Sequence, residues 1–89
     1  MLSLSDVKAA LRVTHNLDDG LISRLLSSAE AECQRFCNLD ALPSELPADM
    51  AQGIIVMIQS DYDADPARRH EYRRAAESLW MPHRELMGI

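Results

Sequence analysis

Apolar and polar residues alternate along this chain with the period of three to four residues that is typical of amphipathic helices. The clearest apolar stripe leads up to Cys37 and consists of Leu21, Ile22, Leu25, Ala29, Cys33 and Phe36. Polar side chains such as Arg24, Gln34 and Arg35 occupy the other side. The pattern predicts a long amphipathic helix with one face turned toward a core.

A shorter helix is predicted for residues 3–13. Ser3 and Asp6 have the spacing of a capping box, in which each side chain binds the backbone N–H of the other residue. The apolar side of this helix is predicted to consist of Val7, Ala10 and Leu11. We expect the helix to end near Val13.

The segment VTHNLDDGLIS, between these two helices, is either a metal-binding loop or a helix start. With Gly20 at the sixth position of a calcium loop, Leu17 and Leu26 would occupy ligand positions, and neither can supply oxygen. A helix start fits better, with Asn16 as the N-cap and Asp19 near the positive end of the helix dipole. We therefore interpret the segment as a cap.

The third predicted helix is apolar on nearly every side. A loop with prolines covers residues 38–46, and Pro47 suits the first turn of the helix that follows. The run from Ile54 to Ile58 is apolar almost all round, which is typical of a helix inside a bundle or beneath a partner subunit. We expect this helix to end near Tyr62.

The last predicted helix begins at Asp65-Pro66, which combines a cap with a first-turn proline. Its predicted buried side consists of Tyr72, Ala75, Ala76, Leu79 and Trp80. Pro82 ends or kinks it, and residues 83–87 add at most a last turn. No segment has the pattern of a strand. The prediction is an all-α, compact bundle of four to five helices in a single domain over residues 1–89, with a long amphipathic second helix and a buried third.

Charge is distributed unevenly over the 89 residues. The 14 acidic and 9 basic side chains give a net charge of −5. Residues 1–65 hold 11 acidic and 4 basic side chains, whereas residues 66–89 hold 3 acidic side chains and 5 arginines. This is not the strongly basic pattern of a nucleic-acid-binding protein. Neither a signal peptide nor an apolar run long enough to cross a membrane is present, so we expect a cytoplasmic product without a membrane partner.

The two cysteines and three histidines are candidates for nucleophilic or metal chemistry. Cys33 and Cys37 lie on or beside the apolar stripe, where reduced thiols behave as small hydrophobic groups. A zinc site made with two of His15, His70 and His83 would have suitable ligand types but lacks the short paired spacing of known sites. We therefore assign no catalytic, cofactor-binding or metal-binding residue.

Three aspartates precede the last helix. Asp61, Asp63 and Asp65 alternate as divalent-cation ligands do, but neither a glycine nor a closing glutamate follows at the required spacing. We interpret them as a solvated junction between two helices, able at most to hold a cation weakly.

The order of the predicted elements carries a family resemblance. Leu11, Arg12 and Val13 close the first helix, and a polar turn with Asp19 follows. The next helix has a Leu-Ile-x-x-Leu start and is rich in Ala and Glu, through Leu21, Ile22, Leu25, Ala29 and Glu30. In this order the pieces resemble the start of the head–tail connector (portal adaptor) proteins of long-tailed double-stranded DNA phages.

The rest of the chain extends this resemblance. LPADMAQGIIVMIQSDY is similar to the family's Leu-Pro entry into a buried helix that ends near an aromatic residue, here Tyr62. SLWMPHREL is similar to its closing segment through Leu79, Pro82 and Arg84, except that His83 stands where an aromatic residue is usual.

The resemblance implies a structural protein of a tailed phage or prophage that joins the DNA-filled head to the tail. It implies a ring-shaped homo-oligomer of about a dozen subunits, closed by repeated contacts around an axis. The implied partners are the portal protein above and a tail-completion or stopper protein below, with DNA passing through the channel without specific binding. The implied location is the head–tail junction of the virion, after assembly in the host cytoplasm.

We expect the interface residues to come from the apolar third helix and the arginine-rich end of the chain. They are Ile54, Ile55, Met57, Ile58, Arg68, Arg69, Arg73, Arg74, Trp80 and Arg84. The acidic body is a natural partner for these arginines across subunits. The alternative is a small helical DNA-binding or regulatory module that uses the Arg68–Arg74 face. An enzyme has less support, because no set of residues resembles a catalytic site.

Overall fold

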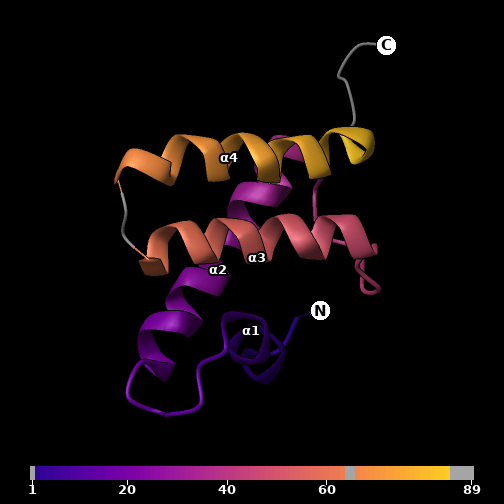
Figure 1. Ribbon diagram of the computed structural model, residues 1–89. Coiled ribbons are helices and arrows are strands. Elements are labelled where there is room, and N and C mark those ends of the chain that lie inside the picture. The colour runs from indigo at the N-terminus through magenta and orange to yellow at the C-terminus, as the bar shows by residue number, and fades with distance from the viewer. Residues whose placement is uncertain (1, 64–65, 85–89) are drawn as a thin grey trace.

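The computed structural model of the protein describes residues 2–63 and 66–84, which form a bundle of helices without strands (Figure 1). The helices are α1 (Leu4–Leu11), α2 (Asp19–Cys37), α3 (Ala48–Asp63) and α4 (Pro66–Trp80), followed by a 3-10 turn, η1 (Met81–His83). The predicted all-α bundle with a long second helix is confirmed. Among the described residues, no helix is both long and apolar enough to cross a membrane.

The capping box predicted for α1 is present. The Ser3 hydroxyl accepts a hydrogen bond from the Asp6 N–H at 3.1 Å, and the Asp6 carboxylate accepts one from the Ser3 N–H at 3.2 Å. The helix ends slightly earlier than predicted, because Arg12 takes a left-handed conformation with φ of 60°. Val7 is fully buried, but Ala10 is exposed, so its predicted burial was wrong.

The predicted N-cap role of Asn16 was also wrong. The N-cap of α2 is Asp18, whose side chain makes no capping hydrogen bond. The Asn16 side chain instead accepts a hydrogen bond from the Lys8 ammonium at 2.7 Å. Lys8 also lies 2.8 Å from the Asp19 carboxylate. A charged donor makes a stronger hydrogen bond than a backbone N–H, so Lys8 holds the α1–α2 loop against α1.

α3 forms the middle of the bundle, with α4 packed along one side and α2 crossing behind it (Figure 1). The core residues are Val7, Ile22, Ala29, Cys33, Cys37, Met50, Ile54, Met57, Ile58, Ala76 and Trp80. The buried third helix is thus confirmed, and Pro47 lies one residue before it rather than in its first turn. On α4 the predicted burial was wrong for Ala75, which is exposed, while Tyr72 and Leu79 are half-buried.

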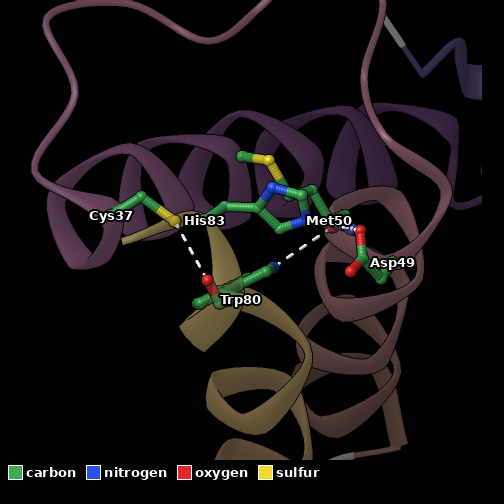
Figure 2. Close-up of polar contacts among 5 residues, drawn as sticks. All are labelled: Cys37, Asp49, Met50, Trp80 and His83. Carbon is green, nitrogen blue, oxygen red and sulfur yellow. Dashed lines mark hydrogen bonds and ion pairs between the residues drawn. The ribbon is translucent and has the colours of Figure 1, made fainter. Parts of the chain in front are cut away.

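Trp80 joins the ends of three helices (Figure 2). Its indole N–H donates to the Met50 carbonyl of α3 at 3.1 Å, and its own carbonyl accepts from the Cys37 thiol of α2 at 3.6 Å. Beside it, the His83 ring lies 2.6 Å from the Asp49 carboxylate. Pro82 ends α4 as predicted and lies in η1, whereas part of the last turn predicted for residues 83–87 falls outside the described residues.

Candidate subunit interface

Four of the ten expected interface residues lie in the core of the subunit itself. Ile54 and Ile58 are fully buried, and Met57 and Trp80 are nearly so. The neighbouring Ile55 is half-buried. The side chains available to a partner are therefore those of the arginines and of residues outside the expected interface set.

The arginines of α4 do not form one uniform face. The Arg68 guanidinium stacks over the Tyr72 ring, 5.1 Å from its centroid. Arg73 donates to both carboxylate oxygens of Glu32 on α2, at 3.1 and 3.2 Å. A single terminal nitrogen of Arg73 makes both contacts, so this charge-assisted hydrogen bond links α4 to α2 within one subunit.

A cavity of about 250 Å³ lies between α2, α3 and the start of α4. It is lined by Ser28, Ala29, Glu32, Met57, Ser60, Asp61, Arg69 and Arg73. Two carboxylates and two guanidinium groups balance in this lining, so the cavity has no preference for a cation or an anion. Ser60 is buried in its wall, as part of the bundle.

A more apolar groove of about 390 Å³ lies at the other end of α4. It is lined by Phe36, Arg74, Glu77, Ser78 and Met81. The guanidinium of Arg84 stacks over Phe36, 5.2 Å from the ring centroid, and Met81 is 53% exposed. We call these six residues the arginine groove. Of the expected interface arginines, Arg74 and Arg84 are thus placed together around an accessible aromatic ring.

At the far end of α2, two leucines are exposed. Leu17 is 90% exposed and Leu21 is 41% exposed. The carboxylate of the adjacent Asp18 accepts a hydrogen bond from the Tyr62 hydroxyl at 2.6 Å. This bond raises the pKa of Tyr62 above its ordinary value, and loss of hydration and the negative charges of Asp18 and Asp63 act in the same direction. We call Leu17 and Leu21 the leucine end.

The leucine end was not predicted. Leu17 lies in a polar segment that was interpreted only as a cap, and the predicted burial of Leu21 on the apolar stripe was wrong. A signal was present, since a leucine between Asn16 and Asp18 follows no helical stripe. Large apolar side chains that are almost wholly exposed are informative when they gather with others.

The cysteines and two of the histidines considered for a zinc site or a nucleophile are engaged in the packing and hydrogen bonds of the bundle. Burial, followed by the charge of Cys37, raises the pKa of the Cys33 thiol to about 12. Burial raises the pKa of Cys37 as well. Both thiols are free. The His15 ring accepts a hydrogen bond from the Leu17 N–H, and the His83 ring contacts the Asp49 carboxylate.

No group of three or more potential metal ligands gathers within residues 2–63 and 66–84. His70 is exposed on α4, apart from the cysteines. Asp61 and Asp63 are exposed near the end of α3, and Asp65 lies outside the described residues. The described part of the chain thus offers surfaces for contact rather than a built metal centre.

Comparison with known proteins agrees with the sequence resemblance. Neither the curated proteins nor the solved structures include a significant match. The family model of the phage gp6-like head-tail connector proteins, in contrast, matches residues 1–77, which include all of α1, α2 and α3 and most of α4. The chain therefore belongs to the gp6-like head–tail connector family of phage proteins.

Proposed function

We propose that this protein is a structural connector that assembles as a ring beneath the portal of a tailed phage and joins the head to the tail. The observation that carries the proposal is the family match over residues 1–77. The portal protein, a tail-completion or stopper protein and further copies of the chain are the proposed partners. The proposed place of action is the head–tail junction, with assembly in the host cytoplasm.

The organisation of the subunit supports a contact protein. Its core is formed by residues of all four helices, and exposed apolar side chains remain at both ends of α2. A ring requires two different surfaces on each subunit, because each copy must contact a neighbour on either side. The leucine end and the arginine groove provide such a pair of surfaces.

We also propose that the protein has no catalytic activity. A nucleophilic cysteine needs a low pKa and access to solvent. Cys33 and Cys37 are both buried, and burial raises the pKa of each thiol. These thiols therefore suit packing rather than nucleophilic attack.

The acidic body suits passage of DNA through a channel. A net charge of −5 repels the phosphate backbone, so DNA can slide past without being held. The alternative DNA-binding module has less support, because Arg73 is engaged by Glu32 and Arg68 stacks on Tyr72. A gel-shift assay at low salt separates the two functions: a connector leaves the DNA mobility unchanged, and a DNA-binding module retards it in a salt-dependent way.

The central test is sedimentation and native mass spectrometry over a concentration series, with and without the portal protein. The expected result is a ring, or a complex with portal that carries several copies of the chain. A strict monomer that also ignores portal would overturn the proposal. A closed two-fold dimer that retards DNA would favour the regulatory module instead.

A further inference from the structure

The two most exposed large apolar side chains lie at opposite ends of α2. Leu17 precedes the first turn of this helix. Met81 borders the groove that contains Phe36, a residue in the last turn of α2. The rise of an α-helix separates Asp19, at the start of α2, from Phe36 by roughly 25 Å. Figure 1 shows the α1–α2 loop and the C-terminal end of α4 at opposite corners of the molecule.

The leucine end is held in place by hydrogen bonds. The Leu17 N–H donates to the His15 ring at 3.2 Å, and Tyr62 binds the neighbouring Asp18. Lys8 contacts both Asn16 and Asp19 and fixes the loop to α1. A surface that is ordered before binding loses less entropy when a partner docks.

The two ends carry opposite charge. Two carboxylates lie beside the leucine end: Asp18 is adjacent to Leu17, and Asp63 is adjacent to Tyr62, whose hydroxyl donates to Asp18. Two guanidinium groups flank the groove, where Arg74 lines it and Arg84 stacks over Phe36, against the single carboxylate of Glu77, so the positive charge is in excess. In the described part of the chain, no ion pair engages Asp63, Arg74 or Arg84. Opposite potentials on two surfaces set the orientation in which they meet.

From these features we infer that the leucine end of one copy of the chain docks into the arginine groove of the next. Leu17 would contact Phe36 and Met81, and the surrounding carboxylates would face Arg74 and Arg84. The inference rests on the proposed ring and names its contact surfaces. Because the surfaces differ and lie at opposite ends of α2, the contact is heterologous and repeats from copy to copy.

A polar substitution on each surface tests this contact. Leu17→Asp disables the leucine end, and Met81→Asp disables the groove; both side chains are exposed, so each subunit should fold normally. Each variant alone should self-associate at least about tenfold more weakly than the natural chain, as expected for a central apolar contact. Ala41→Asp, an equal change of charge at an exposed side chain of the 38–46 loop, is the matched control and should assemble normally.

Mixing the two variants distinguishes the head-to-tail contact from other arrangements. The intact leucine end of Met81→Asp should bind the intact groove of Leu17→Asp, giving a one-to-one heterodimer that grows no further. Circular dichroism of each variant confirms that it is folded. Assembly of both variants at the natural affinity, or two weakened variants that fail to pair when mixed, would overturn the contact.

The same experiments separate this inference from the proposed function. If the natural chain forms rings or binds portal while both variants do so unchanged, the connector function stands and the named contact fails. If the natural chain neither assembles nor binds portal, the connector function itself fails.

Discussion

The indole of Trp80 packs so closely against Gly53 that no side chain fits between them. A Cβ atom built on Gly53 would lie no more than 3.0 Å from three atoms of the indole. This close approach lets the Trp80 N–H reach the Met50 carbonyl one turn earlier on α3. The spacing of α3 and α4 at this end is therefore set by the absence of a side chain at position 53.

Gly53→Ala should destabilise the protein, because the added methyl group displaces Trp80 from its hydrogen bond. Overpacking of a well-packed site costs about 1–3 kcal/mol. Urea denaturation measures the loss. Gly20→Ala is the matched control: nothing lies within 4 Å of its Cβ position, so it should be neutral or raise stability by up to about 1 kcal/mol. Equal effects of the two substitutions would contradict the packing argument.

Ser3→Ala should be more harmful than Asn16→Ala. Ser3 caps α1 through its hydroxyl, and loss of such a cap costs about 1 kcal/mol. Asn16 caps no helix, and its side chain only accepts an exposed hydrogen bond from Lys8. Loss of that bond should cost about 0.5 kcal/mol or less. Thermal unfolding of both variants gives the comparison. A larger loss for Asn16→Ala would restore its role as the N-cap of α2.

Asp49 should make a contribution to stability that disappears in acid. The hydrogen bond from His83 is the main cause that lowers the pKa of Asp49 below its ordinary 3.8. A lowered pKa in the folded state stabilises the protein above that ordinary value, and the gain is lost as the pH falls through the folded value. The difference in unfolding free energy between the natural chain and Asp49→Asn should therefore shrink below about pH 3.8.

His83→Ala provides the control for that titration. In this background Asp49 has lost its ring partner, so Asp49→Asn should have a smaller effect with less dependence on acid. Denaturant melts of the four proteins at several pH values complete the cycle. An acid dependence that is unchanged by His83→Ala would show that another group lowers the pKa of Asp49.

The buried thiols should resist alkylation until the protein unfolds. A pKa of about 12 leaves very little Cys33 thiolate at neutral pH. With iodoacetamide at pH 8, mass spectrometry should show no modification of the folded chain and two modified cysteines in urea. Rapid modification of the folded chain would mean that the C-terminal end of α2 opens readily.

The sequence predicted the helices well because their signals are local. The capping box at Ser3, the stripe from Ile22 to Cys33 and the apolar run around Ile54 each need only neighbouring residues to be interpreted. The ends of the α1–α2 loop were less predictable. Asn16 is a good N-cap by residue type, but its side-chain oxygen accepts a hydrogen bond from Lys8 of the preceding helix instead of from a backbone N–H of α2. A local sequence pattern does not show that Lys8 is within reach.

The candidate interface was less predictable than the fold, for a related reason. An apolar segment such as Ile54–Ile58 suits a subunit contact and a core equally, and the arrangement of α2 and α4 around it decides between them. Likewise, Arg73 and Arg74 are adjacent in sequence, but their side chains lie on different sides of α4. Arg73 meets Glu32, 41 positions away, and Arg74 borders the groove at Phe36.

Trp80 is the only tryptophan of the chain, and it is 1% exposed at the joint between α2, α3 and α4. Its fluorescence therefore reports on this joint alone. Emission at short wavelength corresponds to an indole in its apolar site, and a shift to longer wavelength means that the end of α4 has come away into water. The natural chain thus carries a built-in optical probe, with which the seating of its last helix can be followed without any added label.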